Sequence, residues 1–404
     1  REKITRFTRD HKGIALLSTM AVGGFTCFAT TAPGVETLLV REAATRGLVA
    51  RPVESGGVEF DATPAALADA LVHLRTANRL TVRVAAFHAR TFAELERHAA
   101  KVDWSPFVPA GAAVHFRVTS KKSRLYHQDA IAERLERCLR AVDSGSRMVR
   151  AAAEAEALER DVTRLPGVQR FVVRIFRDDV TISADASGAL LHLRGWRQAV
   201  AKAPLRETLA AAVLAGSGWD RTYPLTDPFC GAGTIPIESA QIAAGIPPGA
   251  HRCFAAERWA SLRGGIDRVR AAARAAERPV TIAIEGSDRD PGAIEAAIAN
   301  AERAGVANVI TFRRAVISDL TPASGAGWVI TNPPYGSRIG DPSTLRDLYA
   351  AFGRVVRERR PRWSVAMMSG DRALDGQTGF AWEELLKTSN GGIPVRLIRA
   401  YPGS

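Results

Sequence analysis

The chain has 404 residues, a length that exceeds one ordinary hydrophobic core and predicts two or three domains. Its residues are 46% hydrophobic and 24% charged, which argues against both wholesale disorder and a polytopic membrane protein. Lysine and arginine exceed the acids by a net charge of +13. That excess favours a polyanionic partner, although an arginine-rich solvated surface would produce the same value.

The first residues raise the question of a targeting segment. Residues 1–12 are basic and residues 13–32 carry no charge, a pattern that superficially resembles a secretory signal. The uncharged run lacks a strong leucine block, and its second half reads better as a strand over 26–30, so we expect 1–24 to be a flexible extension. The four cysteines lack the spacing of a zinc site or a disulfide framework, which predicts no metal and a reducing, cytoplasmic setting.

Up to about residue 190, short β-rich runs alternate with amphipathic helices, which predicts small α+β units. The predicted strands cover residues 27–30, 80–84, 113–119, 171–176 and 180–184. One helix follows Gly34 and another follows Tyr126, each with apolar residues at helical spacing. These residues are Val35, Leu38, Leu39 and Ala43 in the first helix, and Ile131, Leu135 and Leu139 in the second.

From about residue 200, strands and helices alternate regularly, the pattern of a parallel sheet with crossover helices on its faces. One predicted strand ends at Asp227; the others cover 280–284 with an extension to Asp288, 309–312, 328–331, 363–368 and 395–400. A helix capped by Asp290 begins at Pro291 and stops at Gly305. Its inward residues are Ile294, Ala297, Ile298 and Ala301. The predicted fold class is α/β, a doubly wound sheet with an antiparallel terminal strand.

The first motif is Asp-Pro-Phe-Cys-Gly-Ala-Gly-Thr at 227–234, a glycine turn between a strand and a helix. It lies at the carboxyl edge of the sheet, where ligands bind in open α/β folds. Gly231 and Gly233 allow the backbone to approach a nucleoside, and the helix beginning near Thr234 offers free amides. Pro236 replaces the third glycine of the dinucleotide fingerprint, and the P-loop lysine is missing, so pyrophosphate binding is disfavoured.

Two acidic residues follow the next two strands. Asp288, preceded by Ser287, can accept hydrogen bonds from both hydroxyls of a ribose, and Asp319 comes within reach of an adenine amino group. Either residue alone could be a helix cap or a surface carboxylate. Together with the glycine turn, they predict an adenosine pocket.

The most specific motif is Asn332-Pro333-Pro334-Tyr335, directly after the strand at 328–331. An exocyclic base amine is a poor nucleophile, so a site that uses one must hold it in line and accept hydrogen bonds as charge develops on nitrogen. The Asn332 side-chain oxygen and the Pro333 carbonyl can accept them, and the prolines stiffen the loop. The Tyr335 ring offers a face for a base turned out of its stack. A plain proline turn is the alternative.

These residues resemble the THUMP-domain RNA methyltransferases, a branch of the class I enzymes that use S-adenosylmethionine. The resemblance runs from about Thr26 to the end of the chain. It includes Asp-Ala-Ser-Gly at 185–188, Arg-Gly-Trp-Arg at 194–197 and the segment 203–210. Residues 227–238 match the family pattern Asp-Pro-x-Cys-Gly-[Ser/Thr]-Gly that ends in an acid, except that Ala232 replaces the usual hydroxyl residue, which puts one cofactor hydrogen bond of the family in question.

The resemblance implies a domain order: a flexible extension at 1–24, a ferredoxin-like domain at 25–75, an RNA-gripping THUMP domain at 76–190, and a Rossmann-fold methyltransferase domain at 191–404. It implies that Asn332, Pro333, Pro334 and Tyr335 are catalytic. The cofactor, S-adenosylmethionine, would contact Asp227, Phe229, Cys230, Gly231, Gly233, Thr234, Ser287, Asp288, Asp319 and Pro204.

The implied partner is structured RNA, with no membrane and no obligate protein partner expected. Basic residues that could hold RNA phosphates gather between a predicted strand and a helix, although a solvated basic face is the alternative. They are Arg117, Lys121, Lys122, Arg124, His127, Arg134 and Arg137.

Within that family, the chain resembles the bacterial enzymes that make N2-methylguanosine in large-subunit (23S) ribosomal RNA. Related members act on acceptor-stem guanosine of transfer RNA. Amine methylation of adenine or cytosine in DNA would use the same loop, but the THUMP-like half argues against it. A non-catalytic RNA-binding assembly factor is a further alternative, disfavoured because Asp288, Asn332 and Tyr335 are intact.

Overall fold

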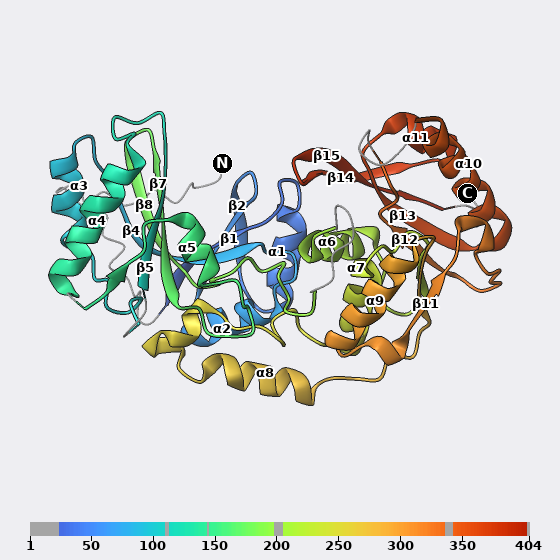
Figure 1. The fold of residues 1–404 in the computed structure, drawn as a ribbon, viewed down its shortest axis with the longest axis horizontal. Coiled ribbons are helices and arrows are strands. Elements are labelled where there is room, and N and C mark those ends of the chain that lie inside the picture. The colour runs from blue at the N-terminus through green and yellow to red at the C-terminus, as the bar shows by residue number, and fades with distance from the viewer. Residues whose placement is uncertain (1–23, 110–112, 144, 198–204, 336–341, 402–404) are drawn as a thin grey trace.

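The structure is a computed structural model that describes residues 24–109, 113–143, 145–197, 205–335 and 342–401. It contains two sheets, an eight-stranded one from the N-terminal half and a seven-stranded one from the C-terminal half (Figure 1). The helix α8 (Gly265–Ala275) packs on α2 (Pro64–His73) and so joins the two halves. Among the described residues, no helix is long and apolar enough to cross a membrane.

The N-terminal half begins with a βαββαβ unit. Its elements are β1 (Phe25–Thr30), α1 (Glu36–Thr45), β2 (Ala50–Glu54), β3 (Gly57–Ala62), α2 and β4 (Arg79–His88). The strand order β2-β3-β1-β4 is that of a ferredoxin-like sheet. The boundary expected at residue 75 therefore falls inside this unit, because β4 is its fourth strand.

The same sheet continues through β8, β7, β5 and β6, so the two expected N-terminal domains share one sheet. The elements of this part are α3 (Phe92–Ala99), β5 (Ala113–Lys121), α4 (Gln128–Val142), β6 (Arg147–Met148), α5 (Ala152–Ala157), β7 (Val168–Phe176) and β8 (Asp179–Asp185). The predicted apolar stripe of α4 is confirmed, because Ile131, Leu135 and Leu139 are fully buried in the core beneath the sheet.

The C-terminal sheet has the order β11-β10-β9-β12-β13-β15-β14, parallel through β13 and antiparallel at its last two strands. Its elements are α6 (Glu207–Ser217), β9 (Leu225–Asp227), α7 (Thr234–Ala244), β10 (Ile284–Asp288), α9 (Pro291–Arg303), β11 (Ile310–Arg314), β12 (Gly327–Thr331), α10 (Pro342–Arg359), β13 (Trp363–Ser369), α11 (Arg372–Gln377), β14 (Glu383–Asn390) and β15 (Ile393–Ala400). The predicted doubly wound fold is confirmed.

Three details differ from expectation. The strand expected from residue 280 begins at Ile284, because neither neighbouring strand extends far enough to pair with 280–283. Ile298, expected to face inward on α9, is 41% exposed, while Ala297 and Ala301 are buried. The terminal strand belongs to a hairpin whose other strand, β14, was missed because it lacks a clear apolar alternation.

The signals expected to bound α9 are present. The side chain of Asp290 accepts a hydrogen bond from the Gly292 amide at 2.9 Å, and Pro291 is the first helical residue. Gly305 has a φ of +73° just after the helix, a conformation that glycine adopts without strain. The helix is thus held at a definite position behind the glycine turn.

A buried ion cluster connects the two halves near the glycine turn. The Glu238 carboxylate on α7 is fully buried and pairs with Arg75 and Arg194, each at 3.1 Å. Arg194 also donates to the Arg75 carbonyl at 2.6 Å. A buried carboxylate needs such partners, so the cluster holds α7 against the N-terminal half.

Candidate functional site

The carboxyl ends of β9, β10 and β12 bring the predicted motifs to one edge of the C-terminal sheet. In the parallel register, Gly286 of β10 lies opposite Asp227 of β9, and Val329 of β12 lies opposite Thr226. Asp227, Asp288 and Asn332 therefore follow three adjacent strands. This convergence is the juxtaposition expected from the sequence, and it places the glycine turn, which follows β9, between Asp288 after β10 and the proline loop after β12.

The two glycines of the turn have different surroundings, although both have positive φ, +52° at Gly231 and +82° at Gly233. A Cβ at Gly231 would meet nothing within 4 Å, so this position faces open space. A Cβ at Gly233 would lie 3.0 Å from the Ala297 side chain and 3.1 Å from the Phe312 ring. Gly231 thus leaves room for a ligand, whereas Gly233 allows α9 and β11 to pack closely.

Asp288 supports the turn directly. Its Oδ2 accepts a hydrogen bond from the Gly231 amide at 3.0 Å, and its Oδ1 accepts one from the Asp290 amide at 3.0 Å. The neighbouring Ser287 carbonyl accepts from the Cys230 amide at 3.0 Å. A carboxylate oxygen has more than one lone pair, so Asp288 can still accept from a ligand hydroxyl.

The remaining predicted cofactor residues are placed less uniformly. Phe229 is half-buried, and Cys230 and Thr234 are buried within the turn. Burial raises the pKa of the Cys230 thiol well above its usual value, so this cysteine is an inert packing residue. Asp319 is exposed in a short 3-10 turn after β11, Ile317–Asp319. Pro204 lies outside the described residues.

Asp227 is buried at the end of β9. Its Oδ1 accepts hydrogen bonds from the Thr331 hydroxyl at 2.5 Å and from the Phe229 amide at 3.1 Å. Burial nevertheless raises its pKa from 3.8 to about 7, because these hydrogen bonds offset only part of the desolvation and the Asp288 charge opposes ionisation. The carboxyl therefore links the glycine turn to β12 and titrates near neutral pH.

We expect Asp227→Asn to flatten the pH dependence of folding stability. The pKa of Asp227 is about 7 in the folded state and 3.8 in the unfolded state, so the folded protein binds this proton more tightly. The stability that the protonated carboxyl contributes is therefore complete below pH 3.8 and is lost as the pH rises through 7. The group lowers stability by up to about 1.4 kcal/mol per pH unit in that interval. Thermal unfolding of both proteins across this range measures the difference. Burial also raises the pKa of Glu207 to about 7, but this residue is present in both the wild type and the variant, so its contribution cancels in the comparison. If stability fell equally steeply with pH in the two proteins, Asp227 would not be the titrating group.

The proline loop presents one side-chain oxygen without a partner. The Asn332 Oδ1 is buried and accepts no hydrogen bond within the described residues. A buried acceptor in that state costs free energy, which functional sites retain when a ligand supplies the donor. The loop around it is rigid: Pro333 is buried, and the Tyr349 hydroxyl donates to the Pro334 carbonyl at 3.2 Å.

Tyr335 is not the open platform that the sequence suggested. Its side chain is only 8% exposed, and its hydroxyl accepts a hydrogen bond from the Asn390 amide nitrogen at 2.9 Å. The ring lies against Gly370, where a Cβ would come within 2.7 Å of it. The sequence could not indicate this, because β13 and the β14–β15 turn supply the contacts.

One residue that supports the site, Asn300, is not predicted from the sequence. Asn300, fully buried on α9, donates from its Nδ2 to the Ala232 carbonyl at 3.1 Å and accepts from Arg303 at 2.5 Å. This hydrogen bond holds the backbone of the glycine turn against α9. The available signal was a polar residue within the apolar stripe of α9.

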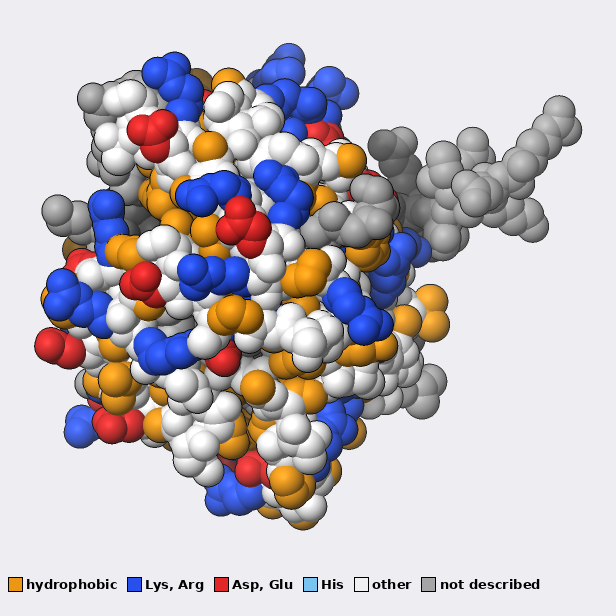
Figure 2. All heavy atoms as spheres, turned by 90° about the vertical axis from the view of Figure 1, so that its right-hand side faces the viewer, with side chains coloured by type: hydrophobic (Ala, Val, Ile, Leu, Met, Phe, Trp, Pro, Cys, Tyr) orange, Lys and Arg blue, Asp and Glu red, His pale blue; other side chains and the backbone are white. Residues whose placement is uncertain are grey.

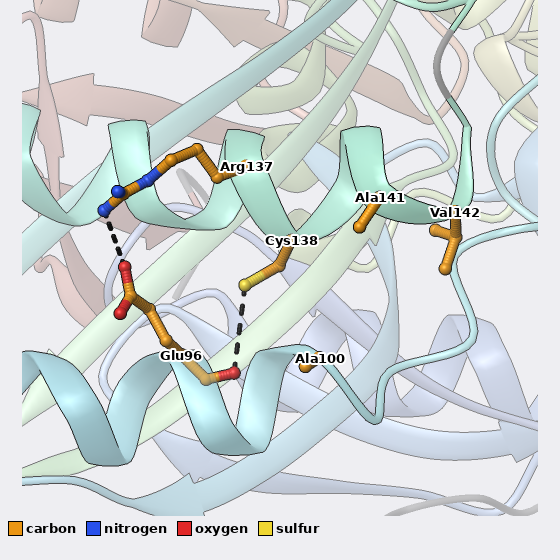
Figure 3. Close-up of a pocket in the computed structure, with 6 residues that line it drawn as sticks. All are labelled: Glu96, Ala100, Arg137, Cys138, Ala141 and Val142. Atoms are coloured by element: carbon orange, nitrogen blue, oxygen red, sulfur yellow. Dashed lines mark hydrogen bonds and ion pairs between the residues drawn. The ribbon is translucent and has the colours of Figure 1, made fainter.

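The predicted basic cluster divides into two groups. Arg117, Lys121, Lys122, Arg124 and His127 are exposed. Arg134 and Arg137 instead face α3, where Glu96 pairs with them at 3.7 and 2.6 Å. Figure 3 shows Arg137 and Glu96 in the small cavity between α3 and α4, of about 330 Å³. Both arginines share the single Glu96 carboxylate, so they are poorer candidates for phosphate contacts than the exposed five, which form no such pair among the described residues.

The end of the molecule that carries the C-terminal sheet is basic in appearance as well. Figure 2 shows lysine and arginine side chains spread over this face, more frequent than acidic ones and separated by hydrophobic and uncharged groups. Within the described residues, no group of His, Cys, Asp and Glu side chains could hold a metal ion. The candidate site is therefore an edge of glycine, carboxylate and amide groups on a positively charged protein.

The chain matches known proteins in both halves. Residues 194–394 match the RMKL-like methyltransferase domain, and residues 26–81 match the RlmL ferredoxin-like domain. The chain is 32% identical over 382 residues to "Putative RNA methyltransferase YpsC" of Bacillus subtilis, covering 91% of this chain and 94% of that protein. It is 33% identical over 392 residues to the ribosomal RNA large subunit methyltransferase K/L of Methylococcus capsulatus, but this alignment covers 92% of this chain and only 50% of that protein.

Solved structures agree over nearly the whole chain. The structure described as "SMU.472, a putative methyltransferase complexed with SAH" superposes with a TM-score of 0.81 at 29% identity, covering 94% of this chain and 98% of that chain. A protein from Listeria monocytogenes described as a predicted N6-adenine-specific DNA methylase gives a TM-score of 0.82 at 30% identity, covering 96% and 99%. From its fold, its motifs at the sheet edge and these matches, the chain belongs to the family of RMKL-like methyltransferases.

Proposed function

We propose that this enzyme transfers the methyl group of S-adenosylmethionine to the exocyclic N2 of a guanosine in large-subunit ribosomal RNA. The observation that carries this proposal is the buried Asn332 Oδ1, which accepts no hydrogen bond within the described residues. An exocyclic amine is a donor that would satisfy this oxygen, and its nitrogen gains positive charge as it is methylated. Asn332 would accept a hydrogen bond from an N–H of the amine and so orient the lone pair of the amine nitrogen.

The glycine turn fits the cofactor. The open space at Gly231 admits a nucleoside, and Asp288 beside it has lone pairs for ribose hydroxyls. When bound, S-adenosylmethionine supplies an electrophilic sulfonium methyl. Phe229, Thr234, Ser287, Asp319 and the backbone at Cys230 complete the proposed contacts, while Pro333, Pro334 and Tyr335 hold Asn332 in place. The match to a protein complexed with SAH supports the same cofactor class.

RNA is the proposed substrate because the names of two groups of relatives point to it. YpsC is named as an RNA methyltransferase, and the K/L proteins are named for ribosomal RNA of the large subunit. The chain spans about half of the K/L proteins, so their substrate is carried over here only as a proposal. We further propose that the part of residues 76–190 that follows β4 forms a THUMP domain that grips the RNA, and that the protein works in the cytoplasm.

The exposed basic residues allow a test of RNA binding that does not depend on methyl transfer. We expect Lys121→Ala combined with Lys122→Ala to weaken RNA binding and to lower the salt dependence of log K by about two units, because two phosphate contacts are lost. Filter binding at several salt concentrations measures this slope. Arg137→Ala is the matched control, since Glu96 already pairs with that arginine. An unaltered slope in the lysine variant would make these residues ordinary surface.

The proposed reaction is tested by tritiated methyl transfer to ribosomal and transfer RNA from cells lacking the protein, followed by mass spectrometry of the labelled nucleosides. N2-methylguanosine in large-subunit RNA is the expected product. Label in transfer RNA alone would move the substrate to that class. DNA from the same cells is offered in a parallel reaction, and label in DNA but not in RNA, as the description of the Listeria protein suggests for that protein, would overturn the choice of RNA. If the protein bound S-adenosylmethionine but transferred no methyl group to any of these nucleic acids, its role would be non-catalytic.

A further inference from the structure

The ends of β5 and β7 form one surface, built from residues 121–127 and 176–179. The Arg124 amide donates to the Asp178 carboxylate at 2.8 Å, and the Asp178 amide donates to the Ser123 hydroxyl at 2.9 Å. The Arg177 amide donates to the Lys121 carbonyl at 3.3 Å. We call this the strand-end surface, formed by Lys121, Lys122, Arg124, Tyr126, Phe176 and Arg177.

Aromatic rings are unusually exposed on the strand-end surface. Tyr126 is 65% exposed and Phe176 is 40% exposed; within the described residues, only Tyr223 and Tyr401 are comparably exposed aromatic side chains. The Tyr126 ring lies 4.1 Å from the His127 ring, and the Arg177 guanidinium lies 5.2 Å from the Phe176 ring centre. Exposed rings beside cations are typical of surfaces that bind a ligand with both flat rings and negative charge, since the aromatic side chains stack on the rings and the cations attract the charge.

The charge of the strand-end surface is unbalanced. In the part of the chain that the structure describes, Lys121, Lys122, Arg124 and Arg177 form no ion pair, although all four are exposed. Asp178 and Asp179, the two acids that follow Arg177 in the chain, are already engaged. Asp178 lies 3.6 Å from Arg90, and Asp179 lies 3.0 Å from His88. Four cations thus remain to interact with an anionic partner.

The backbone of this surface is unusual as well. Lys122, Arg177 and Asp178 have φ values of 53°, 52° and 69°, and they are three of the four non-glycine residues with positive φ in the described ranges. Arg177 and Asp178 are the two central residues of the hairpin turn between β7 and β8, and a two-residue turn of this kind requires positive φ at both. The hydrogen bonds between this turn and residues 121–124 hold it beside the end of β5.

We propose that the strand-end surface binds unpaired RNA nucleotides, with bases stacking on Tyr126 and Phe176 and phosphates contacting the four cations. This inference rests on the proposed function, because it takes RNA as the substrate. Bases in a duplex are stacked on each other and offer no free face, whereas unpaired bases stack readily on aromatic side chains. In Figure 1, β5 and β7 lie on the far side of the ferredoxin-like unit from the methyltransferase sheet. The surface therefore contacts a stretch of RNA other than the target base.

The test is fluorescence anisotropy with a labelled unpaired oligoribonucleotide and a blunt hairpin duplex of the same base composition. Tyr126→Ala and Phe176→Ala should each weaken binding of the unpaired RNA about tenfold, because one stacked base is lost in each case. Duplex affinity should change by less than about twofold, and the salt slope should stay that of the wild type. Tyr126→Phe and Phe176→Tyr should restore binding, since both keep the ring. Tyr223→Ala removes an equally exposed ring from the methyltransferase domain and is the matched control.

Three outcomes would overturn the proposal: unpaired-RNA affinity of the double alanine variant within twofold of wild type, equal loss for duplex and unpaired RNA, or an equal loss in Tyr223→Ala. Melting temperatures and SAH affinity check that the variants fold. If the double alanine variant bound unpaired RNA like the wild type and still methylated RNA, the proposed role of this surface would be refuted and the proposed function would stand. Ring-dependent RNA binding by a wild type that transfers no methyl group would refute the proposed function alone.

Discussion

Asn332→Ala should lower kcat for RNA methylation about a hundredfold or more while leaving cofactor affinity nearly unchanged. The Asn332 oxygen is buried and accepts no hydrogen bond within the described residues, so the reacting amine is the donor we propose for it. Loss of one such preorganised acceptor removes an interaction that strengthens as charge develops, which affects kcat more than binding. Single-turnover methyl transfer with saturating cofactor measures the effect.

The matched variant is Asn332→Asp, which keeps an oxygen acceptor in the same place and should retain more activity than the alanine variant. Calorimetry with SAH separates the two possible causes of a loss, since a collapsed loop would also disturb the neighbouring glycine turn. A rate for Asn332→Ala within a few fold of wild type would show that the oxygen does not contact the amine.

Asp288→Ala should weaken SAH binding about ten- to a hundredfold, the effect expected from losing hydrogen bonds to a charged group. Asp288 holds the Gly231 amide at 3.0 Å, and we propose that it also accepts from the ribose hydroxyls. Both the shape of the turn and a direct ligand contact are therefore lost. Isothermal titration calorimetry gives the affinity.

Asp290→Ala is the control for this experiment. Asp290 lies two residues away, is exposed, and caps α9 through the Gly292 amide at 2.9 Å. Its removal should lower the free energy of unfolding by about 1 kcal/mol and leave SAH affinity nearly intact. If Asp288→Ala behaved in the same way, Asp288 would be a structural residue outside the cofactor contacts.

The sequence alone predicted the parts of this protein whose determinants are local. The glycine turn, the cap at Asp290 and the proline loop are short patterns with fixed backbone requirements, and each stands where a strand ends. Because parallel strands end at one edge, the pattern also predicted that Asp227, Asp288 and Asn332 would meet. The fold class followed from the alternation of strands and helices.

Tertiary structure alone decided which of these side chains remain available to a ligand. The burial of Tyr335 under Asn390 and Gly370, the support of Ala232 by Asn300, and the pairing of Arg137 with Glu96 all join residues from different elements. Local sequence patterns specify backbone conformation, but exposure and charge neutralisation depend on neighbours that only the folded chain brings within contact distance.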